Sequence, residues 1–571
     1  MTKIRLKHLH CTNIKSFRNL DIDIEYQVIV GKNDSGKTSI LRILDLAFNH
    51  LQLKENEFLV EEKTWKEYDP RFPIGHKARR IFLTFDVTDY QKDKEFKSKK
   101  YVSNNEVTLV ICFYSSGEGF FCFDYPKRSI PEKEKKDAVL FYKNLNKYVE
   151  FLFVPSYRNI DSDAFKELET TLIEDNVKNA LPVKTRSHKY INYLEDRFEI
   201  LNKAISSTIE KQSPIPIKHE IGLNLGIDFE DLREFIMKKT SIKDLREHKE
   251  DFELDLKLIG TGITECIYYS MLQTYAIRGA KDKQIILGVD EPENFLHPHA
   301  QREVFFNMIK KLPTAITTIL TTHSPTILDS EEFGNIRRVH KDKTGITHYN
   351  TPRVTKKNDE IYSVFLNPRT SELLYADLVL LVEGESDELV IRLLLKKYLP
   401  NLYPSISIVK LGGNTIFVPW MELINTFSDN SIPWLAVTDL DSLRNTESSN
   451  RPALTPLTKQ KLNQTDKEDL KKYADLTTTN EAAISTQFEN INLISNKYRF
   501  FIMPRDLEYS LVTQSNYQKG ILFLNQKYKK SYPQSLNIDE FRKHLGSYGL
   551  DNAKLQNPSA KLPYIHVNLF N

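Results

Sequence analysis

The stretch Gly31–Ser39, GKNDSGKTS, decides the fold of this chain, because it matches the phosphate-binding pattern G-x-x-x-x-G-K-[ST]. The apolar run 26–30 before it predicts a buried strand, and the apolar spacing over 39–48 after it predicts a helix. In that order, backbone N–H groups turn inward around a triphosphate and the helix N-terminus adds its dipole. The simpler alternative is a glycine turn that only joins a strand to a helix. The candidate nucleotide-binding residues are Gly31, Asn33, Gly36, Lys37 for the outer phosphates, Thr38 for Mg²⁺, and Ser39.

Two later strand ends complete the predicted nucleotide site. The apolar run 284–289 leads to Asp290, which we expect to hold Mg²⁺ through water, and to Glu291, which is placed to polarise the attacking water. A second apolar run, 315–320, leads to His323, which can contact a γ-phosphate if the two strands are neighbours. Taken singly, an acidic loop and a lone histidine are common structural features.

The segment 161–250 separates the two halves of this site, so we expect residues 1–160 and 251–345 to form one domain around an insertion. The insertion is charged and has the pattern of helices. Its clearest apolar stripe recurs at helical spacing through Ile191, Leu194, Phe198, Leu201, Ile205 and Ile209. Such a stripe indicates either a helix that packs on its own domain or a dimerisation arm.

A second domain, 373–571, is predicted after the polar range 346–372, which has the composition of a linker. Apolar runs at 378–382, 406–411 and 434–437 alternate with helical patterns. This alternation predicts a parallel sheet, and the whole chain is therefore expected to belong to the α/β class.

Acidic residues follow two strands of this second sheet: Glu383 follows the first, and Asp439 and Asp441 follow the third. Carboxylates that converge on one sheet edge repel each other unless cations neutralise them. Hard oxygen ligands favour Mg²⁺ or Mn²⁺, so the pattern indicates a divalent metal site. Glu-Gly after a strand and a D-x-D turn can each also arise by coincidence.

Length and composition limit the possible classes of protein. The 571 residues allow about three or four domains. The net charge of +3 gives no overall basic bias, so any nucleic-acid surface is a local patch. The four cysteines form no CxxC pair, which argues against a disulfide framework or zinc cluster and fits a reducing cytoplasm. No apolar stretch approaches the roughly 18 residues of a membrane span, and we expect no membrane partner.

The first-domain motifs resemble the ABC-type ATPase heads of the RecF, SMC and OLD (overcoming lysogenization defect) group. The resemblance rests on GKNDSGKTS, VDEPENFLHP and TTHSP. It implies that two heads sandwich ATP between them. It also assigns Thr261 and Gly262 to the signature motif, which completes the nucleotide site of the partner head. Thr261 stands where the family usually has serine. The family also implies that the helical insertion serves self-association, as a homodimer or larger homo-oligomer.

The second domain resembles a TOPRIM domain, and RTSELLYADLVLLVEGESD, residues 369–387, is especially similar to that of the OLD nucleases. By this resemblance Glu383 binds metal or acts as base, Asp439 bridges metals, and Asp441 completes the first site. Asp387 stands where many relatives have glutamate. Glu508 is the distal acidic ligand that the family implies, and either Lys554 or Lys561 is its C-terminal lysine.

The resemblance implies an ATP-regulated, Mg²⁺- or Mn²⁺-dependent DNA endonuclease of the OLD family that works by two-metal phosphodiester hydrolysis. It also implies anti-phage defence as a Gabija-like or retron-associated effector. The partner is then a helicase, a retron reverse transcriptase with its RNA, or none. Two alternatives remain: an ATP-gated DNA-binding sensor with a non-catalytic TOPRIM scaffold, and a RecF-type repair ATPase.

Overall fold

The structure, a computed structural model, divides into two compact units. The first comprises Met1–Thr351 and Lys356–Pro368, and the second comprises Pro352–Thr355 and Arg369–Asn571. The residues described are 4–54, 57–68, 78–88, 99–123, 130–156, 219–223, 240–244, 253–255, 283–294, 296–313, 315–411, 417–427, 432–438, 463–474 and 481–503, with isolated residues between 269 and 280 and Asn537.

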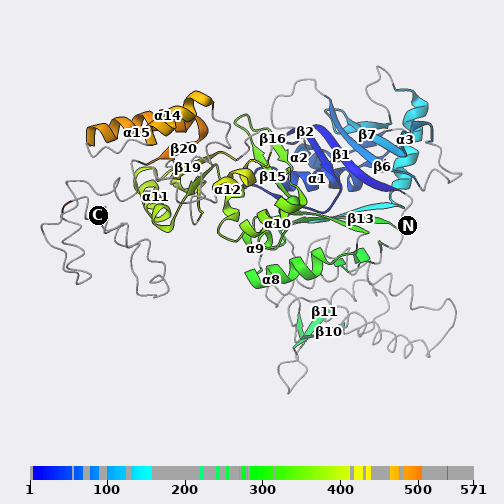
Figure 1. Ribbon diagram of the computed structural model, residues 1–571. Helices are drawn as coiled ribbons and strands as arrows, with labels where there is room; N and C mark the ends of the chain where they lie inside the picture. The colour runs from blue at the N-terminus through cyan, green and yellow to red at the C-terminus, as the bar shows by residue number, and fades with distance from the viewer. Residues whose placement is uncertain are drawn as a thin grey trace, which may run out of the picture. The chain divides into compact units, whose positions relative to one another are not determined.

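The first unit contains a seven-stranded antiparallel sheet with the order β2-β1-β6-β7-β8-β5-β4. Figure 1 shows β1, β2, β6 and β7 as one layer coloured blue to cyan. Apolar and polar residues alternate along β6, which buries Ile81, Leu83 and Phe85 on one face. The strands are β1 (Arg5–Ile14), β2 (Phe17–Asp23), β4 (Gln52–Leu53), β5 (Phe58–Leu59), β6 (Arg79–Asp86), β7 (Glu106–Phe113) and β8 (Glu118–Cys122).

The second sheet of this unit carries the predicted nucleotide motifs. Its six strands have the order β16-β15-β3-β14-β13-β9, and all neighbours are parallel except β16 with β15. Because β14 pairs with both β3 and β13, the expectation that the strand before His323 is a neighbour of the other two is confirmed. The strands are β3 (Gln27–Val30), β9 (Val149–Val154), β13 (Gln284–Asp290), β14 (Ile316–Thr321), β15 (Ile336–Lys341) and β16 (Thr347–Asn350).

Helix α1 (Lys37–Asn49) lies in the core that the two sheets share. Its buried Ile40 and Leu44 belong to one apolar cluster with Phe85 of the first sheet and Phe151 of the second. The other helices whose bounds the structure describes in this unit are α2 (Glu62–Tyr68), α3 (Glu132–Leu145), α8 (Pro298–Glu303), a π-helical segment (Val304–Lys310), α9 (Pro325–Leu328) and α10 (Lys356–Phe365), with 3₁₀ turns at Lys99–Tyr101 and Phe333–Asn335.

The described parts of the range 161–250, which we expect to be helical, are strands. β10 (His219–Leu223) and β11 (Thr240–Asp244) pair antiparallel, and β12 (Glu253–Asp255) adds a third strand. In the register, Ile242 lies opposite both Ile221 and Leu254, and each strand has at most five residues, which is too short for a periodicity to be recognised. The stripe from Ile191 to Ile209 lies outside the described residues.

The range 346–372, which we expect to be a linker, also contains regular structure. β16 is polar, yet Thr347 and Asn350 are buried because Ser16 and His340 satisfy their side chains. Helix α10 buries only Tyr362. A polar strand and a helix with one buried residue give no apolar periodicity, which is why the sequence pattern indicated a linker.

The second unit contains the predicted parallel sheet, with the order β18-β17-β19-β20 and every pair parallel. The fold class is therefore confirmed. The strands are β17 (Leu378–Val382), β18 (Ile406–Lys410), β19 (Trp434–Thr438) and β20 (Phe500–Ile502), and the helices are α11 (Glu385–Tyr398), α12 (Phe417–Ile424), α14 (Gln464–Ala474) and α15 (Glu481–Ser495). No helix among the residues that the structure describes is long and apolar enough to cross a membrane.

Candidate nucleotide and metal sites

The three nucleotide motifs meet at one edge of the six-stranded sheet. The phosphate-binding loop follows β3, Asp290 ends β13, and His323 lies two residues after β14. These strands are parallel and adjacent, so their carboxyl ends share an edge. That edge is where open parallel sheets bind their ligands.

The loop conformation depends on close backbone packing. Gly36 has a φ of 106°, a left-handed conformation that glycine adopts most readily. A Cβ on Gly31 would lie 2.2 Å from the carbonyl oxygen of Val339, so the β15 backbone leaves room only for glycine. Thr347 Oγ1 donates a hydrogen bond to the carbonyl oxygen of Ser35 at 3.1 Å. The hairpin of β15 and β16 therefore packs directly on the loop.

Lys37 is held inside the loop. Its Nζ donates to the carbonyl oxygens of Gly31 and Lys32, each at 3.1 Å, and lies 2.5 Å from His323 Nε2. Burial lowers the pKa of Lys37 to about 8, although the nearby carboxylate of Glu291 opposes this shift. The two loop carbonyl oxygens therefore hold the ammonium group where the loop would surround phosphate.

Thr38 and Asp290, the two predicted Mg²⁺ contacts, are in direct contact. Thr38 Oγ1 donates to Asp290 Oδ1 at 2.9 Å, and Thr321 Oγ1 donates to the same oxygen at 2.6 Å. Asp290 is buried, with 3% of its surface exposed. Hard oxygen atoms at this separation suit one shared divalent cation.

Glu291 has a left-handed backbone, with a φ of 46°, which is strained for a non-glycine residue. Its amide donates to the carbonyl oxygen of Thr321 at 3.0 Å, and its Oε2 accepts from Asn294 Nδ2 at 3.2 Å. Its Oε1 lies 3.4 Å from His323 Nε2. The proximity of His323, with contributions from Asn294 and Lys37, holds the pKa of Glu291 below its usual value. The carboxylate is therefore ionised and can accept a proton from water.

His323 is fixed through its backbone by Glu293. The amide of His323 donates to Glu293 Oε1 at 2.6 Å, and Thr322 Oγ1 donates to the same oxygen at 2.9 Å. The ring nitrogen Nε2 of His323 lies between Lys37 Nζ, at 2.5 Å, and Glu291 Oε1, at 3.4 Å.

The residues at this edge fit a magnesium nucleotide. The buried Ser35 Oγ has no hydrogen-bond partner among the described residues, and it lies within the loop whose N–H groups would surround phosphate. The remaining predicted loop residues, Asn33 and Ser39, lie before and at the start of α1.

The second sheet edge brings together the ends of β17 and β19. Thr438, the last residue of β19, donates its hydroxyl hydrogen bond to Glu383 Oε1, directly after β17. Asp387 Oδ2 accepts from the amide of Gly384 at 2.8 Å and has 8% of its surface exposed. Asp387 therefore caps the N-terminus of α11.

The other predicted site residues lie outside the described residues: Thr261, Gly262, Asp439, Asp441, Glu508, Lys554 and Lys561. Within the described part of the chain, no three His, Cys, Asp or Glu side chains are grouped closely enough to hold a metal ion.

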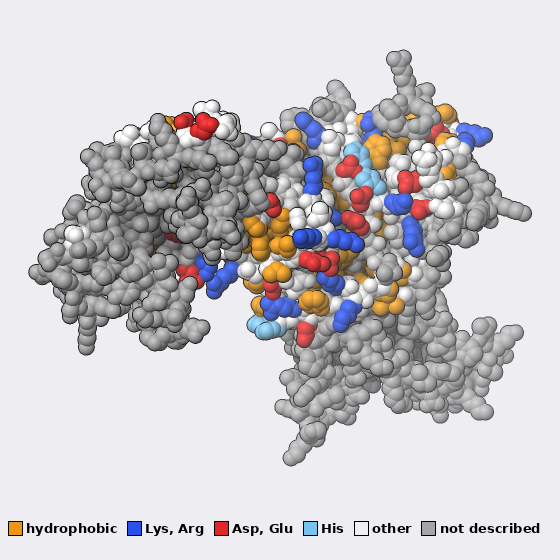
Figure 2. Space-filling view, viewed as in Figure 1, with side chains coloured by type: hydrophobic (Ala, Val, Ile, Leu, Met, Phe, Trp, Pro, Cys, Tyr) orange, Lys and Arg blue, Asp and Glu red, His pale blue; other side chains and the backbone are white. Residues whose placement is uncertain are grey.

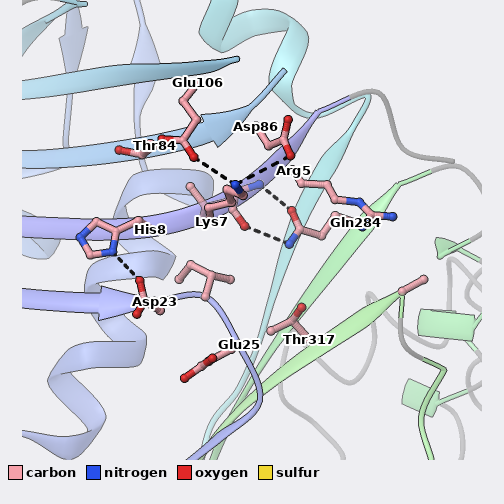
Figure 3. A pocket seen from close by; sticks show the side chains of 13 residues that line it. Arg5, Lys7, His8, Asp23, Glu25, Thr84, Asp86, Glu106, Gln284 and Thr317 are labelled. Carbon is pink, nitrogen blue, oxygen red and sulfur yellow. Dashed lines mark hydrogen bonds and ion pairs between the residues drawn. The ribbon is translucent and has the colours of Figure 1, made fainter. Parts of the chain in front are cut away.

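A cavity of about 730 Å³ lies away from the nucleotide motifs, at the amino ends of β13 and β14. Figure 3 shows Lys7 between Glu106 and Asp86, at 3.0 and 3.9 Å, and Gln284 paired with the backbone of β1. These side chains satisfy one another, so the cavity is not the candidate site.

The view in Figure 2 shows basic and acidic side chains interspersed over the described surface of this face, with no single basic patch. This face therefore identifies no nucleic-acid track.

The sequence motifs include two residues whose roles the pattern did not reveal. Glu293 holds His323, and Asn294 holds Glu291 while also donating to the carbonyl oxygen of Ser156 at 3.3 Å. Both lie inside VDEPENFLHP. Their position as two consecutive polar residues shortly after a buried strand is the sequence feature that could have indicated a role in the site.

Comparisons with known proteins match both units. Residues 28–329 match the family described as "AAA domain, putative AbiEii toxin, Type IV TA system". Residues 374–441 match "Overcoming lysogenization defect protein-like, TOPRIM domain". The first match spans more than half of the chain.

Two relatives are similar over most of their length. The Old nuclease of Escherichia phage P2 is 23% identical over 482 residues, covering 77% of this chain and 78% of that protein. Endonuclease GajA of Bacillus cereus (strain HuB5-5) is 22% identical over 536 residues, covering 78% of this chain and 75% of that protein. Among solved structures, the SMC head domain from Thermotoga maritima is 15% identical, covers 61% of this chain and all of that chain, and has a TM-score of 0.33.

Proposed function

This chain belongs to the OLD family of ATPase-linked TOPRIM nucleases, and we propose that it is a DNA endonuclease whose nucleotide state controls cleavage. The observation that carries the proposal is the hydrogen bond from Thr438 to Glu383. It joins the ends of β17 and β19, and Asp439 is the next residue in the chain. The acidic motifs thus follow strand ends that meet.

In this proposal Glu383, Asp439 and Asp441 hold the divalent metal, with Asp387 and Glu508 as further ligands. Mg²⁺ or Mn²⁺ bound there would activate water and stabilise the charge that develops on a phosphodiester. The hydrogen bond from Thr438 holds the Glu383 carboxylate at the shared end of β17 and β19, where it would bind metal or receive a proton. Lys554 and Lys561 remain the candidates for the lysine beside the scissile phosphate.

The ATPase half uses its own residues in parallel roles. Lys37 binds the outer phosphates, Thr38 and Asp290 hold Mg²⁺, and Glu291 takes the proton of the attacking water. His323 contacts the γ-phosphate. Thr261 and Gly262 would complete the site of a second copy, which makes self-association part of the proposal.

The biological role we propose is anti-phage defence in the cytoplasm, in line with the relatives named Old nuclease and endonuclease GajA. A helicase or a retron reverse transcriptase with its RNA is the proposed class of partner.

One observation favours a second candidate, a nucleotide-gated DNA sensor without catalysis. Asp387 is buried and its carboxylate caps α11, so part of its ligand capacity is used within the fold. A TOPRIM unit that lacks this ligand would serve as a scaffold.

Incubation of the full chain with supercoiled plasmid separates the two candidates. We expect nicked or linear product with Mg²⁺ or Mn²⁺, none with EDTA, and a rate that differs between ATP and ADP. DNA binding in a gel-shift assay without any product in either metal would support the sensor and contradict the nuclease. A rate independent of nucleotide would contradict the regulatory part alone.

A further inference from the structure

Glu293 connects the two loops that carry the catalytic candidates of the ATPase half. It lies in the turn after β13, three residues beyond Asp290, yet both hydrogen bonds to its Oε1 come from the loop after β14. One of them is the short bond, 2.6 Å, from the backbone amide of His323. The position of that amide therefore depends directly on the Glu293 carboxyl.

The second carboxyl oxygen of Glu293 makes no competing contact. Glu293 Oε2 is buried and has no hydrogen-bond partner among the described residues. Burial also raises the pKa of Glu293 above its usual value. Apart from the backbone amide of Glu293 itself, the hydrogen-bond donors to this buried carboxyl belong to the loop after β14, so its evident effect is to hold that loop.

The ring of His323 has a defined target. Its Nε2 lies 2.5 Å from Lys37 Nζ and 3.4 Å from Glu291 Oε1, so a small rotation of the loop would move it from both. Thr322, the other donor to Glu293, also accepts from the amide of Ser324 at 2.9 Å. The hydrogen bonds thus fix the residues on both sides of His323.

We propose that Glu293 is a positioning residue, which holds the 322–324 loop so that the His323 ring faces the outermost phosphate of the nucleotide. This inference rests on the nucleotide-binding part of the proposed function. Glu293 itself does not touch the nucleotide. It acts through His323, and its removal has no further effect once His323 has lost its ring.

The test is a double-mutant cycle with Glu293→Ala and His323→Ala, measured by steady-state ATP hydrolysis. Glu293→Ala is expected to lower kcat by about 10- to 100-fold while KM changes by less than about threefold. In the His323→Ala background the same substitution is expected to change kcat by less than about twofold. An equal loss in both backgrounds would overturn the proposal, because a structural role does not depend on the His323 ring.

A conservative variant separates positioning from charge. Glu293→Gln keeps an oxygen acceptor for the His323 amide and the Thr322 hydroxyl, so its kcat is expected to stay within about threefold of the wild type. A loss as large as that of Glu293→Ala would contradict a positioning role through these bonds.

Glu331→Ala is the control for lost stability. Its buried carboxylate contacts Tyr26, Lys310 and Asn335, none of which belongs to the nucleotide site. It is expected to lower the melting temperature at least as much as Glu293→Ala with kcat unchanged. A comparable fall in kcat would attribute the Glu293 effect to stability.

A second readout works without hydrolysis. The ratio of dissociation constants for ADP and a non-hydrolysable ATP analogue reports the contact with the γ-phosphate. Glu293→Ala is expected to lower this ratio at least about fivefold in the wild-type background and not in His323→Ala. A wild type that binds both nucleotides without hydrolysis would contradict the proposed ATPase activity, while this ratio would still decide the role of Glu293.

Discussion

The Nζ of Lys37 lies 2.5 Å from the Nε2 of His323, although 286 positions separate the two residues in the chain. Lys37 starts the helix after β3, and His323 follows β14, the strand beside β3. The contact joins the residue expected on the outer phosphates to the residue expected on the γ-phosphate. Both residues are therefore expected to contact the same end of a bound nucleotide.

Replacing Lys37 removes the ammonium group that the carbonyl oxygens of Gly31 and Lys32 hold inside the loop. Lys37→Met is expected to weaken ATP binding at least about 100-fold, measured by titration of a fluorescent ATP analogue. Lys54→Met is the control, because Lys54 pairs with Glu118 at 3.4 Å on the antiparallel sheet. Equal affinity in wild type and Lys37→Met would contradict the nucleotide site.

The contact between Thr38 and Asp290 predicts a magnesium effect. Asp290→Asn is expected to keep the affinity for metal-free ATP within about threefold of the wild type. The increase in ATP affinity that Mg²⁺ causes is expected to be at least about tenfold smaller than in the wild type. Isothermal titration with and without Mg²⁺ measures both. The matched control is Asp45→Asn, another buried carboxylate of this unit, which pairs with Asn49 and His50. A full magnesium response in Asp290→Asn would exclude Asp290 as a contributor.

His340 predicts how stability depends on pH. Burial, with the neighbouring Arg338 and His348, lowers its pKa from 6.5 to about 4. Between pH 6.5 and 4 the unfolded chain binds a proton at this site that the folded chain does not, so folding stability falls as the pH falls through this window.

The loss is on the order of 1–2 kcal/mol after solvent screening, and it is absent in His340→Gln. Melting temperatures at pH 7.5 and pH 5 measure the difference: the drop is expected to be smaller in His340→Gln. An identical drop in both proteins would show that His340 is not the group responsible.

The packing of Gly31 on β15 predicts a large cost for a single methyl group. Gly31→Ala places a Cβ 2.2 Å from the Val339 carbonyl oxygen, and is expected to lower the free energy of unfolding by about 2–3 kcal/mol. Gly345→Ala is the comparison, since its Cβ meets nothing within 4 Å and only its φ of 82° is unfavourable, at about 1 kcal/mol. A larger loss of unfolding free energy in Gly345→Ala than in Gly31→Ala, measured by urea denaturation, would contradict the close packing of Gly31 against Val339.

The sequence predicted the elements whose signal is local. The strand before Gly31, the helix after it and the strands before Asp290 and Glu383 all combine apolar runs with a fixed motif, and the structure has them within one or two residues. The convergence of Lys37 with His323 followed from the expected strand neighbours.

The remaining features depend on contacts that no local pattern contains. Thr347 is buried in a strand because Ser16 and Ser35 satisfy it, and neither is near it in the chain. Glu293 holds His323 only because two separate loops meet, so its role required coordinates. The strand pair of Ile221 and Ile242 was likewise too short to show a period.

The central claim is that Glu383 belongs to a metal-dependent nuclease site, and Glu385 provides a matched control two residues away. Glu385 is exposed and pairs with Lys410 at 2.5 Å. The decisive measurement is the rate of plasmid nicking in Mn²⁺ by Glu383→Gln, Glu385→Gln and the wild type. We predict that Glu383→Gln loses at least about 100-fold and Glu385→Gln stays within about twofold. Nicking by Glu383→Gln at the wild-type rate, or an equal loss in both variants, would contradict the claim.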